Sequence, residues 1–206
     1  MIYLDNAAST AVHPEVVKEM MPYFDVQYGN PSSIHQFGRK AKNAIQKARK
    51  QVAALIGAEP DEILFTSGGT ESNNTILFGY SILIPNFEQH HVITSSIEHE
   101  AILAPCKELE KKGYKITYLP VDEHGMIDPS EIANSITSTT GLVSIMFANN
   151  EVGTIQPIKE ISEICKKYQI SLHTDAVQAV GKIPIDVKEL GVDALSISSH
   201  KINGPK

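Results

Sequence analysis

The chain has 206 residues, 42% of them hydrophobic, which is enough for one domain with a sizeable core. Its 18 Lys and Arg against 24 Asp and Glu give a formal charge of −6, without the basic stripe that nucleic-acid binding requires. The longest apolar runs are too short to cross a bilayer and the start lacks the pattern of a signal peptide, so we expect a cytoplasmic protein with neither membrane nor nucleic acid as a direct partner.

The two cysteines, Cys106 and Cys165, do not form a CxxC pair. Neither a zinc site nor a disulfide framework is therefore expected. Both fall within stretches of helical apolar spacing and are interpreted as core residues. A reducing compartment fits this cysteine usage best.

Hydrophobic periodicity separates helices from strands along the chain. The helical stripe from 41 to 56 stops before Gly57, a typical residue just past a helix end. In chain order we predict a helix over 41–56, a strand over 62–66, a helix over 70–83, a strand over 91–95, a helix over 100–113, a strand over 114–119, a helix beginning at 128, a strand over 142–148, a helix over 158–168 and strands over 170–174 and 194–198. Strands that alternate with helices predict an α/β fold, with a mostly parallel sheet covered by helices on both faces.

Ligands of such sheets bind at the carboxyl ends of the strands, so residues that directly follow predicted strands are the candidates for a site. The run SGGTES at 67–72 follows one strand and opens a helix. Its two glycines allow close backbone approach, and the free amides of a helix N-terminus favour an anion such as phosphate. An ordinary strand–helix turn is the alternative interpretation.

His99 follows the predicted strand at 91–95. His99 and Glu100 resemble the start of an HExxH zinc motif, but position 103 is Leu, so no metal site is expected. A lone histidine in this position is more often structural than functional.

Two further strand ends carry polar side chains. Asn149 and Asn150 follow one apolar strand, where side-chain amides either make turns or orient ligand oxygens. Asp175 ends another strand in an apolar context, where a carboxylate usually needs a cationic partner, although a structural cap is the alternative. Gln178, three residues later, is placed to face the same cavity.

Lys201 stands just past the last predicted strand, flanked by Ser198 and His200. Partial desolvation there lowers the pKa of a lysine and frees its amine as a nucleophile, whereas a surface loop is the alternative for any single lysine. Together the strand ends supply a phosphate seat, a flat ring, an amide, a carboxylate and an amine. That set matches the needs of pyridoxal phosphate.

Several longer stretches also carry a family resemblance. They are YLDNAAST (3–10), GNPSSIHQFGRKA (29–41), ILFTSGGTESNN (63–74), TSSIEHEAIL (94–103), SIMFANNEVGTIQPI (144–158), HTDAVQAVGKIPID (173–186) and SISSHKINGPK (196–206). In order and spacing they resemble the cysteine desulfurases of the NifS-like group, which are pyridoxal-phosphate enzymes of the class V aminotransferase fold. The resemblance covers essentially the whole chain.

The resemblance implies a role for each candidate residue. Lys201 would bond covalently to the cofactor aldehyde and, once released, act as a base, and His99 would stack on the pyridine ring. Asp175 would pair with the ring nitrogen. The remaining contacts would be Gly69, Thr70, Ser198 and His200 at the phosphate, and Asn150 and Gln178 on the side of the phenolic oxygen.

The implied reaction removes sulfur from L-cysteine and yields L-alanine and an enzyme persulfide. Iron–sulfur cluster assembly or tRNA thiolation would receive the sulfur, through acceptor or scaffold proteins, and family members are homodimers. Residues 1–206 would form the pyridoxal-phosphate-binding large domain, similar to that of aspartate aminotransferase, with 1–12 belonging to the small domain.

Family members are about twice as long, so the chain resembles their amino-terminal part. The rest of the large domain, the carboxyl-terminal small domain, the persulfide cysteine and the carboxylate-binding arginine would lie in the other part. We therefore expect no desulfurase turnover from this chain alone.

Three alternatives remain. One is another class V enzyme, such as a selenocysteine lyase, a kynureninase-like hydrolase or an aminotransferase. The second is a non-catalytic pseudoenzyme that retains the fold. A nicotinamide-dependent dehydrogenase is disfavoured because no GxGxxG motif opens a helix.

Overall fold

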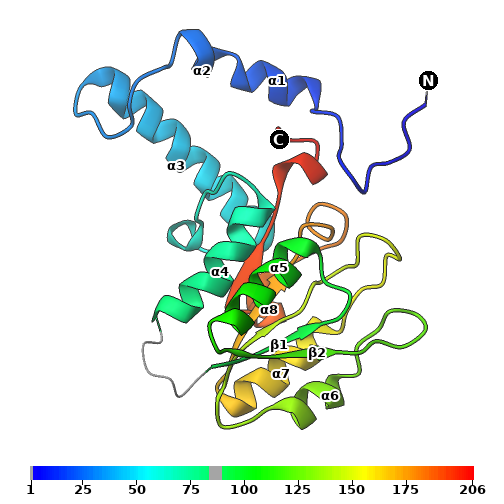
Figure 1. Cartoon of the computed structure of the whole chain (residues 1–206). Coiled ribbons are helices and arrows are strands. Elements are labelled where there is room, and N and C mark those ends of the chain that lie inside the picture. The colour runs from blue at the N-terminus through cyan, green and yellow to red at the C-terminus, as the bar shows by residue number, and fades with distance from the viewer. Residues whose placement is uncertain (1, 84–89) are drawn as a thin grey trace. The chain divides into compact units, whose positions relative to one another are not determined.

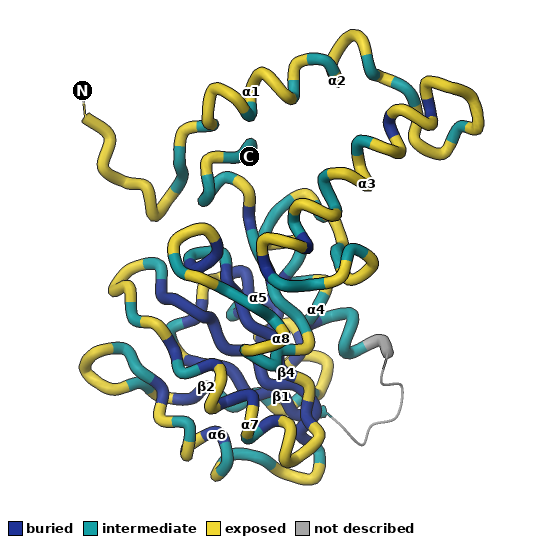
Figure 2. Tube along the Cα trace, turned by 180° about the vertical axis from the view of Figure 1, so that it is seen from behind, coloured by how far each residue is buried: buried dark blue, intermediate teal, exposed yellow. Residues whose placement is uncertain are grey.

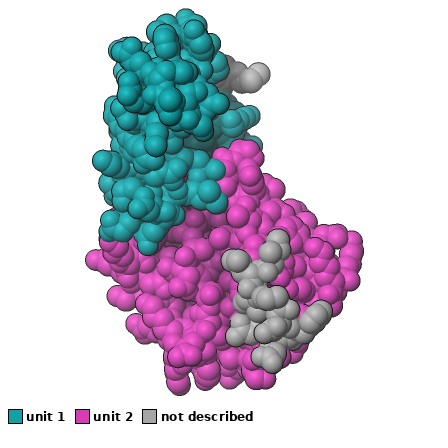
Figure 3. All heavy atoms as spheres, turned by 90° about the vertical axis from the view of Figure 1, so that its left-hand side faces the viewer, with its two compact units in different colours: residues 1–65, 199–206 teal, residues 66–198 magenta. Residues whose placement is uncertain are grey.

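The structure is a computed structural model that describes residues 2–83 and 90–206 (Figure 1). The chain forms two compact units, which we call unit 1 (residues 1–65 and 199–206) and unit 2 (residues 66–198) (Figure 3). Within the described residues, no helix has both the length and the apolar character needed to span a membrane.

Unit 2 contains a five-stranded sheet. The strands are β1 (His91–Ser95), β2 (Lys115–Leu119), β3 (Thr140–Ser144), β4 (Ser171–Asp175) and β5 (Ala194–Ser196). Their order is β2-β1-β3-β4-β5, and every neighbouring pair is parallel. The predicted parallel α/β fold is therefore confirmed, and all five carboxyl ends share one edge.

The helices of unit 2 lie on both faces of this sheet (Figure 1). They are α4 (Gly69–Leu83), α5 (Glu100–Lys111), α6 (Pro129–Ser135), α7 (Ile158–Tyr168) and the short α8 (Val187–Leu190). Val92 of β1 and Leu142 of β3 pack with Leu77 of α4 and Ile102 of α5 in one buried cluster. Since side chains alternate along a strand, Ile93 and Val143 face the opposite side and are also fully buried.

Unit 1 is mainly helical. It contains α1 (Pro14–Met20), α2 (Pro22–Asp25), α3 (Gln36–Ile56) and two 3₁₀ turns, η1 (Pro60–Glu62) and η2 (Ser199–Lys201). Backbone hydrogen bonds join its two chain segments, because Thr10 donates to the carbonyl of His200 at 2.9 Å and His13 donates to that of Asn203 at 2.9 Å. As predicted, α3 ends at Gly57, which has a φ of +72°.

The strand predicted over 62–66 is wrong. Its first residue ends η1, and the rest joins no strand of the described sheet. Leu64 and Phe65 are exposed, Arg49 of α3 donates to the carbonyl of Ile63, and the same guanidinium lies 5.0 Å from the centroid of the Phe65 ring. A short apolar run does not by itself reveal whether a neighbouring strand exists.

Other differences are smaller. The helices α1, α2 and α8 were not predicted, and α3 begins five residues before the predicted stripe. The regular part of β3 ends at Ser144, yet the backbone of Ile145 still donates to the carbonyl of His173 at 3.1 Å and that of Phe147 donates to Asp175 at 2.9 Å. The predicted strand therefore still pairs with β4 as far as Phe147, beyond the assigned end of β3.

Candidate cofactor site

Seven of the nine predicted site residues belong to unit 2, where each one follows a strand or opens a helix beside the carboxyl edge of the sheet. Those residues are Gly69 and Thr70 at the start of α4, His99 after β1, Asn150 after β3, Asp175 and Gln178 at and after the end of β4, and Ser198 after β5. Parallel pairing places the ends of β1, β3, β4 and β5 at one edge, so the sheet brings these segments together.

Asp175 is the buried carboxylate of this edge, with 5% of its surface exposed. The side-chain amide of Asn73 in α4 donates to Oδ2 at 2.6 Å, and the backbone of Val177 donates to Oδ1 at 3.0 Å. Hydrogen bonds donated to a carboxylate favour its ionised form. The site thus holds an oriented negative charge of the kind that pairs with a protonated ligand nitrogen.

The glycines at the start of α4 allow other groups to come close to its backbone. A Cβ added to Gly69 would lie 3.0 Å from Cγ2 of Val177 and 3.5 Å from Cβ of Ser198, so the segments after β4 and β5 converge on this glycine. At Gly68 an added Cβ would meet nothing within 4 Å. The first amides of α4, with its dipole, form a suitable seat for an anion.

Glu71 also lies in the first turn of α4, where its carboxylate accepts a hydrogen bond from the backbone of Ser67 at 2.6 Å. The hydrogen bonds from Ser67 lower the pKa of Glu71. This exposed carboxylate binds the amide of Ser67, which precedes α4, and so does not occupy the amides of Gly69 and Thr70 that are the candidates for an anion.

His99 is exposed and precedes the first residue of α5. Its Nδ1 accepts a hydrogen bond from the backbone of Ala101 at 3.1 Å, so the ring caps α5 and the proton resides on Nε2. His99 thus has a structural role as a helix cap, and its predicted role at a cofactor stays a prediction. The cap fixes one ring atom and is compatible with a stacking role for the ring face.

Glu98 was not predicted as a site residue. Its hydrogen bonds fix the segment after β1 that also contains His99. Its Oε1 accepts from the hydroxyl of Ser95 at 2.7 Å and from the backbone of Met146 at 2.8 Å, and it thereby connects the segments that follow β1 and β3. Oε2 is buried without a partner among the described residues. Burial raises the pKa of Glu98 to about 8, against the opposing effect of these hydrogen bonds.

The two asparagines after β3 differ in role. Asn149 makes the turn, because its Oδ1 accepts from the backbones of Glu151 and Val152 at 2.8 and 3.0 Å and its Nδ2 donates to the carbonyl of Ile97 at 3.1 Å. Asn150 is half-buried. The turn interpretation therefore holds for Asn149, and the ligand role of Asn150 stays a prediction.

Gln178 follows Asp175 within the same turn region and is half-buried. Its Oε1 accepts a hydrogen bond from Nζ of Lys182 at 2.6 Å. This contact fixes the orientation of the amide, because the amide oxygen accepts and the NH₂ group donates. The structure leaves the predicted role of Gln178 untested.

A second group of polar contacts, around His173 of β4, lies inside the sheet. His173 is fully buried two residues before Asp175, and its ring bonds the hydroxyls of Ser144 in β3 at 2.9 Å and Ser196 in β5 at 3.0 Å. Burial lowers the pKa of His173 to about 3, so the ring is neutral. It ties three strands together on the face that Asp175 shares.

Lys201 and His200 belong to unit 1. The amine of Lys201 donates to the carbonyls of Ala7 and Ala8, the second at 3.0 Å, and Nδ1 of His200 lies 3.3 Å from the hydroxyl of Ser9. Partial burial lowers the pKa of His200, and the charges of Lys201 and Lys206 lower it further. How Lys201 meets the residues of unit 2 stays a prediction.

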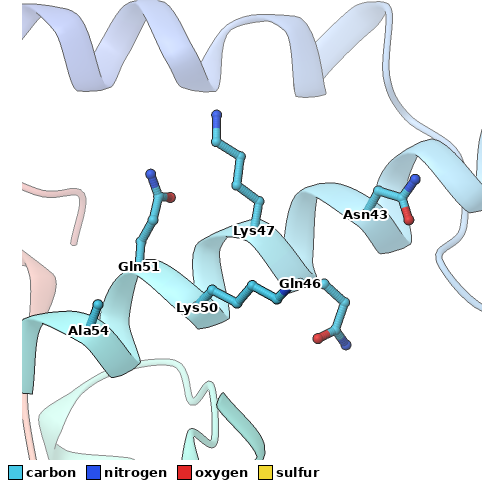
Figure 4. Close-up of a pocket in the computed structure, with 6 residues that line it drawn as sticks. All are labelled: Asn43, Gln46, Lys47, Lys50, Gln51 and Ala54. Atoms are coloured by element: carbon cyan, nitrogen blue, oxygen red, sulfur yellow. The ribbon is translucent and has the colours of Figure 1, made fainter. Parts of the chain in front are cut away.

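A pocket on α3 in unit 1 is unrelated to these residues (Figure 4). It is lined by Asn43, Gln46, Lys47, Lys50, Gln51 and Ala54. None of the predicted site residues lines it, and its side chains project from a single helix.

The residues of unit 2 fit pyridoxal phosphate on chemical grounds. A buried carboxylate suits the protonated ring nitrogen, and the glycine-lined start of α4 suits the phosphate. Asn73 contributes to this fit but was not predicted. Only its helical phase, four residues before the buried Leu77, distinguished it from Asn74.

Comparison with known proteins agrees with this geometry. The model of the family Aminotransferase class-V matches residues 2–206. The chain is 54% identical over its whole length to the cysteine desulfurase IscS of Dictyoglomus turgidum, of which it covers 52%, and 56% identical to that of Methanosarcina thermophila, of which it covers 50%. The chain thus spans about half the length of these curated relatives.

Solved structures give the same result. One described as "SspA in complex with cysteine" superposes on the whole chain with a TM-score of 0.97 and 42% identity, and the chain covers 59% of it. A "NIFS-LIKE PROTEIN" superposes with a TM-score of 0.96 and 44% identity, with 56% of that protein covered.

Proposed function

The chain belongs to the aminotransferase class-V family, and from this premise we propose that it is the cofactor-binding part of a cysteine desulfurase that uses pyridoxal phosphate. The observation that carries the proposal is the edge of unit 2, where the carboxylate of Asp175 and the start of α4 converge with Ser198. Identities of 54% and 56% to cysteine desulfurases support this reaction over the other class V activities.

Each residue then has a defined task. Asp175 pairs with the ring nitrogen, His99 supplies a ring face, and the amides of Gly69 and Thr70 hold the phosphate. Bound pyridoxal phosphate supplies an electron sink for the Cα of an amino acid. Lys201 supplies the amine that holds the aldehyde and moves the Cα proton, while Asn150, Gln178, Ser198 and His200 position the group.

Sulfur removal also needs a thiolate that attacks the sulfur of L-cysteine. Cys106 and Cys165 are unsuited to this step, because both are buried and burial raises the pKa of each thiol to about 12. We therefore propose that these residues serve the core of unit 2 and that the attacking thiol comes from elsewhere. Purified chain incubated with pyridoxal phosphate and L-cysteine should release no sulfide above the background of the cofactor alone.

The cofactor assignment has a direct test. The chain is mixed with pyridoxal phosphate, reduced with borohydride, digested and mapped by mass spectrometry. We expect one dominant adduct on Lys201 that disappears in Lys201→Ala and persists in Lys206→Ala, a neighbouring lysine. Adducts spread evenly over surface lysines, in the wild type as in Lys201→Ala, would contradict the proposal.

The substrate and setting follow from the same proposal. L-cysteine is the proposed substrate, which is consistent with the relative solved in complex with cysteine. Sulfur-acceptor or scaffold proteins of iron–sulfur cluster assembly are the proposed partners, with a homodimer as the assembly. We also propose a cytoplasmic setting, which fits the two reduced cysteines.

A further inference from the structure

Asn73 lies in the second turn of α4 and is 1% exposed. Its Nδ2 donates to Oδ2 of Asp175 at 2.6 Å, a contact between residues 102 positions apart in the chain. Its Oδ1 is buried without a hydrogen-bond partner in the described structure. A buried unsatisfied acceptor is costly, so this amide is not the side chain that stability alone would favour.

The orientation of the amide follows from the charge it faces. An ionised carboxylate only accepts hydrogen bonds, so the NH₂ end of Asn73 must point to Asp175. The reverse orientation would set two acceptors against each other and require a proton on the carboxylate. The contact at 2.6 Å therefore selects the ionised, oriented form of Asp175.

The donor is also uncharged. A lysine or arginine in the place of Asn73 would neutralise Asp175 and weaken its attraction for a ligand cation. Two titratable groups of unit 2 lie close in sequence or space, and burial holds the pKa of His173 at about 3 and that of Glu98 at about 8. Both groups are therefore mainly neutral at pH 7.

We propose that Asn73 is a positioning residue whose uncharged hydrogen-bond donor fixes the orientation and the ionised form of the Asp175 carboxylate toward a cationic ring nitrogen. The identity of that nitrogen rests on the proposed function. The hold of Asn73 on Asp175 is a property of the chain without any ligand.

The first test measures the pH at which the carboxyl of Asp175 titrates. The titration of its side-chain carboxyl is followed by ¹³C NMR in the 206-residue chain without cofactor, for the wild type, Asn73→Leu and Asn74→Leu. We expect the midpoint to rise by about one to two pH units in Asn73→Leu, because a hydrogen bond to the ionised form is lost. Asn74→Leu is the matched control, since the side-chain amide of Asn74 donates to the carbonyl of Thr70 in its own helix, at 2.7 Å.

An equal midpoint in the wild type and Asn73→Leu would overturn the proposal. If the leucine is not tolerated, Asn73→Ala removes the same donor with a smaller side chain, and the same comparison decides. A purely structural role would change the thermal midpoint of the chain without moving the Asp175 titration.

The second test measures the affinity of the chain for pyridoxal phosphate. The dissociation constant for pyridoxal phosphate is obtained from its visible absorption, and we expect about tenfold weaker binding in Asn73→Leu and wild-type binding in Asn74→Leu. Equal affinity in all three proteins would overturn the role of Asn73 toward the ring nitrogen. Absence of binding by the wild type would count against the proposed function, while the NMR titration would still decide whether Asn73 controls Asp175.

Discussion

Units 1 and 2 are contrasting regions of the same chain. In unit 2, all residues of β1 and β3 are buried and its helices cover both faces of the sheet (Figure 2). In unit 1, α1 and α2 bury no residue, and Val17, Phe24 and Val26 are exposed. Unit 2 therefore has its own apolar core, whereas unit 1 is held mainly by hydrogen bonds and a few contacts of α3.

The largest expected difference concerns apolar truncation. Leu77→Ala removes a side chain that is 0% exposed in the core of unit 2 and should lower the free energy of unfolding by about 2–5 kcal/mol. Phe24→Ala in unit 1 removes a 72% exposed ring and should change it by less than about 0.5 kcal/mol. Urea unfolding followed by circular dichroism measures both, and equal losses would refute the contrast.

Glu98 should make the stability of unit 2 fall as pH rises toward 8. Its folded pKa of about 8 exceeds the ordinary glutamate value of 4.5, so the unfolded chain releases the proton first and stability falls as pH rises between these values, by about 1.4 kcal/mol per pH unit. Glu98→Gln should remove this slope in urea midpoints measured from pH 6.5 to 8. Glu100→Gln, an exposed neighbour, is the control and should keep it.

His173 should make unit 2 sensitive to acid. Its folded pKa of about 3 lies below the ordinary histidine value of 6.5, so the unfolded chain takes up a proton first and stability falls as pH drops below 6.5. His91, whose pKa burial lowers to about 4, acts in the same direction, and Glu98 opposes them both. The three groups together place the stability maximum near pH 6.5, at the crossover of the two effects.

The variant His173→Gln should flatten the acid side by about 1.4 kcal/mol per pH unit between pH 6.5 and 5, relative to the wild type. His124→Gln changes a histidine whose side chain is 78% exposed and should leave the slope as it is. Thermal unfolding at a series of pH values distinguishes the two, and an unchanged slope in His173→Gln would show that the buried ring does take up a proton.

Two glycines give a further comparison, in which the destabilising substitution lies in unit 1 and the stabilising one in unit 2. In unit 1, a Cβ on Gly38 would collide with the carbonyl of Ser33 and lie 2.7 Å from that of Asn30, so Gly38→Ala should destabilise by about 1–3 kcal/mol. In α4 of unit 2, a Cβ on Gly79 meets nothing within 4 Å, so Gly79→Ala should stabilise by about 0.5–1 kcal/mol. Loss of stability in both variants would contradict this assignment.

Much of unit 2 could be predicted from the sequence, because local patterns carry the information. The apolar run at 91–95 and the helical spacing at 158–168 define β1 and α7 with the predicted bounds. The run at 63–65 is equally apolar but joins no strand of the described sheet, and no local pattern reports the absence of a neighbour. In unit 1, α1 and α2 bury nothing and so left little periodicity to detect.

The candidate site divides in the same way. Residues that follow strands, such as Asp175 and His99, could be found by their position, because parallel strands bring their carboxyl ends to one edge. Asn73 and Glu98 could not be found in this way. The role of Asn73 depends on its contact with Asp175, and that of Glu98 on its contact with Met146, and both partners are distant in the sequence. Asn149 and Asn150 are neighbours of the same type, and only the folded turn assigns the turn contacts to Asn149.

The sequence by itself determined the alternation of strands and helices, the parallel sheet and the edge at which a ligand would bind, since hydrophobic periodicity and strand ends are local properties. Only the tertiary structure decided which amide holds Asp175, which carboxyl stays protonated and which apolar run remains outside the sheet. These outcomes depend on distances between residues far apart in the chain, and burial there changes the energies of charge and hydrogen bonding.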